Sequence, residues 1–337
     1  VRAMTWFKSS FNPVVTEIER GGEEKGILRH FITGADPDWF YIVNDAHAYI
    51  SRMTDLTQVI GGVMQSNATG LGIMHVTGPS GSGKSTLVRA ALRNIVNTYK
   101  YIYEFNGGGG IDTDLLRISV SKFTEKSIFV FYEASEYYYA ISYMAQHFAG
   151  RENPYCLFIL EDRTSEYMRN KAQLRYAHAV KAFELTELST PDATAIAKKI
   201  EDSGLVFDKF SELPLQRRAS IILDKERGYG GDLLSALFSL TTHENFEEKI
   251  YRDYSSVSTE AGRVVLDIVA ITNSLGFNVP IHYVAGMLSV PVSEVVKAVS
   301  NDLAGVVVEK SGSLRCRHRI IANYYFNNCI SGRGSVE

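Results

Sequence analysis

The chain has 337 residues, of which 45% are hydrophobic and 22% are charged, and its formal net charge is −3 at pH 7. This length allows two or three compact units, and the small charge gives no general attraction to nucleic acid or to an anionic membrane. No apolar run approaches the roughly 20 residues of a membrane span, so no transmembrane helix and no membrane partner are predicted; the sequence also shows no signal peptide.

The three cysteines, Cys156, Cys316 and Cys329, lie far apart in the sequence. At most one pair can form within the chain, so we expect a reducing, cytoplasmic location. The chain begins at Val1 rather than at Met. We therefore expect it to be a segment of a longer protein.

The first part of the chain is predicted to be a flexible N-terminal segment at 1–26, followed by a P-loop nucleotide-binding domain at 27–188. In the second range, strand-like and helix-like segments alternate. This alternation favours a mainly parallel sheet with helices on both faces, which is a three-layer α/β/α fold. The predicted strands are 72–77, 100–105, 127–132, 155–160 and 178–185, and the predicted helices between them are 85–98, 111–122 and 138–148.

A helical subdomain is predicted at 189–257. Thr190 is placed to cap a helix that has Pro191 at its first position and Gly204 at its end, which is the usual distribution of these residues. The pattern stays helical to about Thr242.

The last part of the chain is predicted to be a winged-helix domain at 258–330. Three helical patterns come first, and two short β-like pieces, "VVVEK" and "SLRCRH", follow them around Ser311-Gly312. Three helices and a two-stranded wing are the elements of such a domain.

The segment "GPSGSGKST" has the spacing of a phosphate-binding loop, because Gly78 is followed after four residues by Gly83-Lys84-Ser85. Glycines let successive backbone N–H groups face an anion, and the next helix adds its positive N-terminal end. A glycine-rich turn that matches by chance is the alternative, but the predicted strand before the loop and the predicted helix after it favour the phosphate site. Lys84 is expected to hold the terminal phosphates and Ser85 to ligate Mg²⁺. The predicted nucleotide-binding residues are Gly78, Pro79, Ser80, Gly81, Ser82, Gly83, Lys84, Ser85 and Thr86.

An acid at the end of another strand is expected to orient Mg²⁺ and polarise water. Glu133 follows the predicted strand 127–132 directly, and Glu136 comes three residues later. We predict Ser85 and Glu133 as the metal ligands, with Glu136 as the alternative acid or the water-polarising base. Tyr132 occupies the usual Asp position if the strand stops one residue earlier, and Glu136 is otherwise a solvated residue at a helix start.

Arg163 follows the fourth predicted strand, next to the strand that carries the acids. A guanidinium binds phosphate oxygens with two parallel hydrogen bonds, so Arg163 is a candidate sensor of the γ-phosphate. The alternative is a surface ion pair with Glu161 or Asp162. Lys84, Glu133, Glu136 and Arg163 form the predicted catalytic set.

The order of these parts resembles the STAND class of signal-transduction ATPases, which are relatives of AAA+ proteins. The parts are the P-loop, "FVFYEAS", "LFILEDR", "FELTELSTPDATAIAKKI", "GYGGDLLSAL" and "LRCRHRIIANYYF". The segment "HFITGADPDWFYIVNDAHAYISRM" is similar to the N-terminal region of bacterial antiviral STAND proteins. The similarity covers roughly residues 27–327.

This resemblance implies a slowly hydrolysing molecular switch in a signalling or antiviral defence protein. ATP or ADP with Mg²⁺ would be buried between the P-loop domain and the winged helix, and His318 would contact the β-phosphate of ADP. Trp39, Phe40 and Arg52 either border the adenine or, for the two aromatic residues, pack in the core. Activation would produce a homo-oligomer, and a protein trigger would be sensed by regions outside this chain.

A second hypothesis is an AAA+-like ATPase that binds DNA through its winged helix. The helix in the recognition position carries Lys297 but also Glu294 and Asp302, and it has no Arg. Base reading and phosphate neutralisation both need cations or hydrogen-bond donors there. Nucleic acid is therefore the weaker expectation. A metabolic kinase or transporter-type ATPase would leave the helical and winged parts unexplained.

Overall fold

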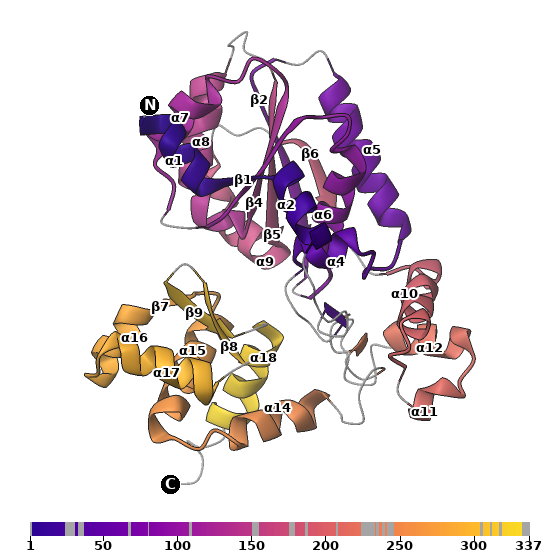
Figure 1. Ribbon diagram of the computed structural model, residues 1–337, viewed down its shortest axis with the longest axis vertical. Helices are drawn as coiled ribbons and strands as arrows, with labels where there is room; N and C mark the ends of the chain where they lie inside the picture. The colour runs from indigo at the N-terminus through magenta and orange to yellow at the C-terminus, as the bar shows by residue number, and fades with distance from the viewer. Residues whose placement is uncertain are drawn as a thin grey trace. The chain divides into compact units, whose positions relative to one another are not determined.

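The protein is described by a computed structural model in which the chain divides into two compact units (Figure 1). The first unit consists of Val1–Ile32, Asp36–Leu205 and Glu212–Leu233, and the second of Thr33–Ala35, Val206–Ser211 and Leu234–Glu337. Within them the structure describes residues 2–23, 31–32, 37–66, 69–79, 81–107, 110–149, 155–174, 179–185, 188–206, 208–223, 233, 236–237, 240, 246–303, 306–310, 312–316 and 319–331.

A six-stranded sheet lies at the centre of the first unit, with the strand order β1-β3-β4-β5-β2-β6. Strands β2 to β6 run parallel, and β1 pairs antiparallel with β3 at one edge. The five parallel strands are those predicted, because nearly continuous apolar runs are typical of strands buried on both faces. The bounds are β1 (Phe11–Pro13), β2 (Leu71–Gly78), β3 (Tyr101–Phe105), β4 (Ser127–Tyr132), β5 (Cys156–Arg163) and β6 (Ala179–Glu184).

Helices cover both faces of this sheet (Figure 1). Alternate residues of a strand point to opposite faces, so Val130 belongs to one core while Phe129 and Phe131 belong to the other. The result is the predicted three-layer α/β/α arrangement. The first core is shared with α2 (Val14–Glu23), α4 (Trp39–Val43), α5 (Ser51–Gln65) and α6 (Lys84–Ile95), and the second with α1 (Arg2–Ser10), α7 (Thr113–Val120), α8 (Tyr138–Phe148) and α9 (Thr164–Asn170).

The N-terminal residues differ from the flexible segment predicted at 1–26, because residues 2–23 form α1, β1 and α2. The rings of Phe7 and Phe11 stack with centroids 4.7 Å apart, and both rings are buried against Phe129 of β4. Phe11 also pairs with Phe105 at the sheet edge. Burial of two aromatic rings outweighs the polar composition on which the prediction was based.

Two further helices of the first unit, α10 and α12, pack against each other. The cap of α10 is Ser189, one residue before the predicted Thr190, and its hydroxyl accepts from the N–H of Asp192 at 3.3 Å. The Asp192 carboxylate in turn accepts from the N–H of Ser51 at the start of α5, at 2.8 Å. The bounds are α10 (Thr190–Asp202) and α12 (Leu215–Leu223), while α11 (Asp208–Ser211) groups with the second unit.

The second unit packs its helices around a small antiparallel sheet with the order β7-β9-β8. Strands β8 and β9 are the two predicted β-like pieces, and β7 adds a strand that was not predicted, in which Val279 pairs with Leu314. The winged-helix assignment stays a prediction. The bounds are α14 (Phe246–Ser255), α15 (Glu260–Ser274), β7 (Val279–Pro280), α16 (Ile281–Leu288), α17 (Val292–Asn301), β8 (Val307–Lys310), β9 (Ser313–Cys316), α18 (Arg319–Tyr324) and the π-helical η3 (Tyr325–Ile330).

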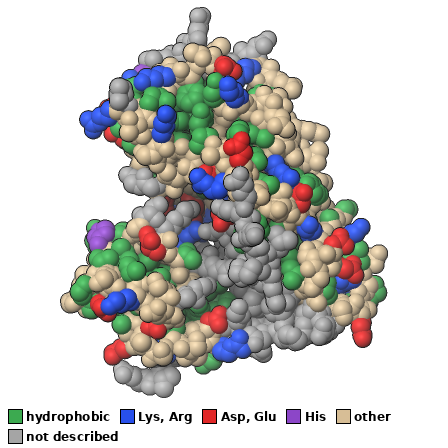
Figure 2. All heavy atoms as spheres, viewed as in Figure 1, with side chains coloured by type: hydrophobic (Ala, Val, Ile, Leu, Met, Phe, Trp, Pro, Cys, Tyr) green, Lys and Arg blue, Asp and Glu red, His purple; other side chains and the backbone are tan. Residues whose placement is uncertain are grey.

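Hydrophobic side chains gather on the surface of the second unit over α16 and α17 (Figure 2). Those exposed on these two helices include Tyr283, Met287, Val292 and Val296. Groups of exposed apolar side chains are typical of interaction surfaces. Among the helices that the structure describes, none is long and apolar enough to cross a membrane.

Candidate functional site

The loop between β2 and α6 has the left-handed backbone conformation at two of its glycines. Gly81 and Gly83 have positive φ angles of 70° and 83°, a region that glycine occupies without steric cost. A Cβ on Gly78 would lie 2.9 Å from the Cβ of Leu185, so a side chain there would collide with its neighbour. The predicted strand, loop and helix therefore follow one another as a phosphate-binding loop requires.

Lys84 and Ser85 begin α6, at the end of the helix where the backbone dipole is positive. The Lys84 ammonium donates to the Pro79 carbonyl at 2.8 Å, and the Ser82 hydroxyl donates to the same carbonyl at 2.9 Å. Burial lowers the pKa of Lys84, because it disfavours the charged form. A phosphate beside this ammonium would favour its charged form. Gly78, Pro79, Gly81, Ser82, Gly83, Lys84, Ser85 and Thr86 lie in or directly after the loop, and Ser80 is outside the described residues.

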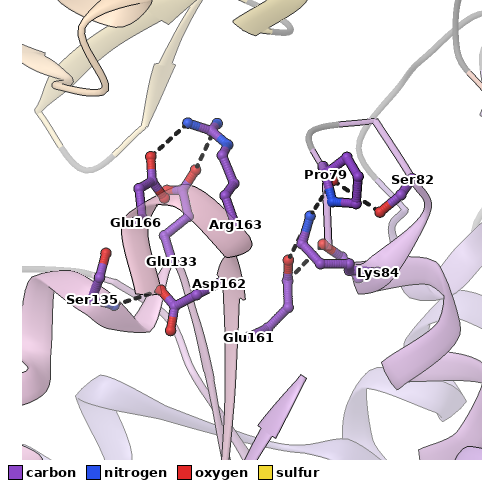
Figure 3. A network of polar contacts seen from close by, with 10 residues as sticks. Pro79, Ser82, Lys84, Glu133, Ser135, Glu161, Asp162, Arg163 and Glu166 are labelled. Carbon is purple, nitrogen blue, oxygen red and sulfur yellow. Dashed lines mark hydrogen bonds and ion pairs between the residues drawn. The ribbon is translucent and has the colours of Figure 1, made fainter. Parts of the chain in front are cut away.

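Glu161 of β5 contacts both residues that begin α6 (Figure 3). The Ser85 hydroxyl donates to Oε2 of Glu161 at 2.8 Å, and Nζ of Lys84 lies 3.8 Å from Oε1. The side chain is buried, and this burial raises the pKa of the Glu161 carboxyl, although the charge of Lys84 opposes the change. From the sequence, Glu161 was considered only as a surface ion-pair partner of Arg163. Glu161 is an acid near the end of the strand that pairs directly with β2, and that position is the signal that could have identified it.

Glu133, which follows β4, lies nearer to Arg163 than to the loop (Figure 3). Oε1 of Glu133 is 4.0 Å from Nη2 of Arg163, whose Nη1 lies 2.8 Å from Oε1 of Glu166. Arg163 thus forms ion pairs, but with Glu133 and Glu166 rather than with Glu161 or Asp162. Glu136 lies in the short 3₁₀ helix η1 (Ala134–Tyr137). The catalytic roles of Glu133, Glu136 and Arg163 stay predictions.

Asp162 is adjacent to Glu161 in β5 but points to the opposite face of the sheet (Figure 3). It accepts from the N–H of Ser135 at 2.7 Å and from the hydroxyl of Tyr138 at 2.5 Å. Burial raises the pKa of Asp162 to about 7, against the effect of these two donors. Asp162 therefore holds the turn that carries Glu136.

A second buried carboxylate, Glu104 of β3, contacts α6 further along the helix. It accepts from Nε of Arg89 at 3.0 Å, from Nε1 of Trp39 at 3.0 Å and from the hydroxyl of Tyr132. The guanidinium of Arg89 also lies over the rings of Trp39 and Tyr132. Trp39 is 4% exposed, which fits packing in the core better than a position beside adenine.

The oxygen atoms beside the loop fit a magnesium site. Mg²⁺ takes hard oxygen ligands, and in phosphate sites it usually binds one or two protein oxygens together with phosphate oxygens and water. The hydroxyl of Ser85 and the carboxylate of Glu161 are such donors, and they already lie together at the N-terminus of α6. The arrangement can therefore hold a polyanion and a divalent cation at one edge of the sheet. His318, the predicted contact of the β-phosphate, lies outside the described residues.

The model of a protein family described as Novel STAND NTPase 5 matches residues 29–175 of the chain. The matched range contains the loop, α6, β4 and β5. This match confirms the resemblance to STAND NTPases and the P-loop NTPase α/β fold of the first unit. No curated protein matches the chain.

Three solved structures illustrate how distant the structural relatives are. The Aeropyrum pernix Orc1 protein, solved in complex with DNA, is 13% identical over 84% of this chain and 93% of that chain, with a TM-score of 0.44. The Thermotoga maritima RuvB Holliday junction branch migration motor is 12% identical over 81% and 93%, with a TM-score of 0.39. Cdc6p from Pyrobaculum aerophilum is 12% identical over 80% and 92%, with a TM-score of 0.43. At these identities no ligand or activity is transferred to this chain.

Proposed function

We propose that the chain is the ATP-binding switch of a STAND-type protein, in which exchange of ADP for ATP controls assembly into a homo-oligomer. The premise is the STAND NTPase match over residues 29–175. The observation that carries the proposal is the glycine loop with Lys84 and Ser85 at the N-terminus of α6. This is a site for the phosphates of a nucleotide.

Hydrolysis in this proposal is slow and returns the switch to its ADP state. Lys84 would stabilise the charge that develops on the γ-phosphate oxygens when water attacks, and bound Mg²⁺ would supply further stabilisation of that charge. The position of Glu133, the predicted acid after β4, supports slow turnover. Glu133 lies 4.0 Å from Arg163 and faces it rather than the loop (Figure 3), so it is not placed beside the phosphate site.

The biological setting that fits this switch is a cytoplasmic signalling or antiviral defence protein. A protein trigger would be sensed by regions outside this chain. The exposed apolar side chains of α16 and α17 support a role for the second unit in contacts with another protein or another copy. Nucleotide exchange can bias such contacts only if ATP and ADP bind the two conformations with different affinity.

Nucleotide binding by the Lys84→Ala variant tests the proposal directly. Titration with a fluorescent ATP analogue should show a loss of affinity of at least about 100-fold, because a buried ammonium that pairs with phosphate is removed. Lys297→Ala, which removes an exposed cation on α17, is the control and should bind normally. Equal affinity in the wild type and in Lys84→Ala would overturn the nucleotide site.

The switch itself is tested by the nucleotide that the purified protein carries and by its mass in solution. Mass spectrometry should find retained ADP, and light scattering should show a larger species when ATP and Mg²⁺ replace it. A monomer in both nucleotide states would contradict nucleotide-controlled assembly while leaving ATP binding intact.

A DNA-binding ATPase is the second candidate, and it has less support. On α17, Lys297 is paired with Glu294 at 3.0 Å, so this helix presents little positive charge to a phosphate backbone. Binding of duplex DNA in the micromolar range or tighter, with affinity that falls as salt rises, would favour this candidate.

A further inference from the structure

We infer that Glu161 of β5, rather than Glu133 after β4, is the carboxylate that binds Mg²⁺ together with Ser85. The inference rests on the proposed function, because the metal would arrive with the nucleotide phosphates. It replaces the predicted metal ligand by a residue on the neighbouring strand.

The two oxygen atoms that would bind the metal are already close together. Oγ of Ser85 and Oε2 of Glu161 lie 2.8 Å apart. Two neighbouring ligands of an octahedral Mg²⁺, each at about 2.1 Å and at right angles, lie about 3.0 Å apart. A magnesium ion can therefore bind both oxygens without a large movement of either side chain, provided that the Ser85 O–H bond turns away from Glu161.

The neighbouring position on β4 already makes a different contact. Tyr132 pairs with Glu161 in the sheet register, but it has no carboxylate, and its hydroxyl donates to Glu104. The next residue, Glu133, has a positive φ angle of 52° and lies beside Arg163. The residue that reaches the start of α6 is Glu161.

The contacts of Glu161 differ from those of a simple counter-ion of Lys84. The Lys84 ammonium makes its hydrogen bond at 2.8 Å with the Pro79 carbonyl and is 3.8 Å from Glu161. The short contact of Glu161 is with Ser85, the residue that the loop supplies to Mg²⁺. The carboxylate is thus aimed at the metal position more closely than at the ammonium.

The test compares ATP affinity in EDTA with ATP affinity in Mg²⁺, for the wild type, Glu161→Gln and Glu133→Gln. Glutamine has the shape of glutamate but lacks its charge, so the two variants are matched. We expect the dissociation constant of ATP in EDTA, divided by that in Mg²⁺, to fall at least about tenfold in Glu161→Gln. Loss of a metal contact of this kind typically costs about 10-fold to 100-fold in affinity. Glu133→Gln should keep the wild-type ratio.

A second readout uses Mn²⁺ as the metal probe, with a non-hydrolysable ATP analogue present. Paramagnetic resonance of the free ion should show weaker Mn²⁺ binding in Glu161→Gln than in Glu133→Gln and the wild type. The inference is overturned if Glu161→Gln keeps the full metal effect, if Glu133→Gln loses it, or if Glu161→Gln loses metal-free ATP affinity, which would assign Glu161 to the shape of the loop. If the wild type binds no ATP, or if Lys84→Ala binds as well as the wild type, the proposed function itself fails.

Discussion

Two buried glutamates contact the same helix, α6, but in different ways. Glu104 accepts hydrogen bonds from Arg89, Trp39 and Tyr132. Within the described residues, Glu161 accepts one hydrogen bond, from Ser85, and lies 3.8 Å from Lys84. The two carboxylates are equally buried, at 5% and 6% exposure, so burial alone does not distinguish them.

The difference lies in how completely each carboxylate is satisfied. An ionised carboxylate has about four acceptor positions, and the donors around Glu104 fill them. Such a group fixes structure, because any change leaves buried donors without an acceptor. Among the described residues, the donors around Glu161 leave acceptor positions unfilled, next to the predicted phosphate-binding loop. A buried acid that is only partly satisfied beside a binding loop is a candidate ligand.

The largest expected effect on stability comes from removing Glu104, whose acceptor positions are filled. Glu104→Ala leaves the guanidinium of Arg89 buried without its carboxylate, so we expect the free energy of unfolding to fall by about 3–5 kcal/mol. Trp6 and Trp39 are the two tryptophans of the chain, and both lie in the first unit. Urea unfolding followed by tryptophan fluorescence therefore reports on this unit. A loss below about 1 kcal/mol would show that the Glu104 contacts are not structural.

His75 of β2 is a buried base whose hydrogen bonds are also only partly formed among the described residues. Among the described residues, its Nδ1 has no hydrogen-bond partner, and burial lowers the pKa of His75 from 6.5 to about 4. Below pH 6.5 the unfolded chain binds a proton that the folded chain does not. Stability should therefore fall between pH 6.5 and pH 4, by roughly 3 kcal/mol from this group.

The variant His75→Phe tests this pH dependence. The apolar ring should lose the acid-induced fall that His75 contributes, measured as the difference between unfolding free energies near the two ends of that pH range. His282→Phe changes an exposed histidine of α16 and serves as the control. The same pH profile in His75→Phe and the wild type would contradict the assignment of a buried neutral imidazole.

The sharpest test of the comparison makes the same change at both glutamates. Glu161→Gln should change stability by less than about 1 kcal/mol at pH 7, because glutamine still accepts from Ser85 and the cost of a buried charge disappears. Glu104→Gln should cost at least about 2 kcal/mol, because the amide N–H₂ faces the donors of Arg89 and Trp39. Equal losses in the two variants would remove the distinction between a structural and a ligand carboxylate.

The smallest effect is expected at an exposed ion pair. Lys297 and Glu294 of α17 lie 3.0 Å apart, with side chains 67% and 54% exposed. Lys297→Ala should change the stability of the second unit by less than about 0.5 kcal/mol, measured by urea unfolding with circular dichroism. A larger loss would mean that exposed ion pairs, and not only buried ones, contribute substantially to the free energy of unfolding.

The sequence predicted the parts of the fold that repeat a simple pattern. The parallel strands are apolar runs, and the loop from Gly78 to Ser85 has fixed spacing, so both were found without structural information. The N-terminal helices were not found, because their stability comes from contacts of Phe7 and Phe11 with distant strands. The short strand β7 was missed since it depends on pairing with β9.

The candidate site was only partly predictable for a similar reason. Lys84 and Ser85 follow from spacing, but the acid beside them depends on which strand lies next to β2. The structure places β5 there, with Glu161 close to Ser85. In the sequence, Glu133 and Glu161 are equivalent, since each ends an apolar strand. Register and strand order, which a single sequence does not specify, separate them.

The adjacent acids Glu161 and Asp162 connect β5 to both helical layers of the first unit. Glu161 accepts a hydrogen bond from Ser85, which is predicted to bind the metal. The next residue, Asp162, accepts hydrogen bonds from the N–H of Ser135 and the hydroxyl of Tyr138. Because adjacent residues of a strand point to opposite faces of the sheet, β5 places one carboxylate in each of the two helical layers. Asp162 thereby fixes the start of α8, on which Tyr139 is 79% exposed.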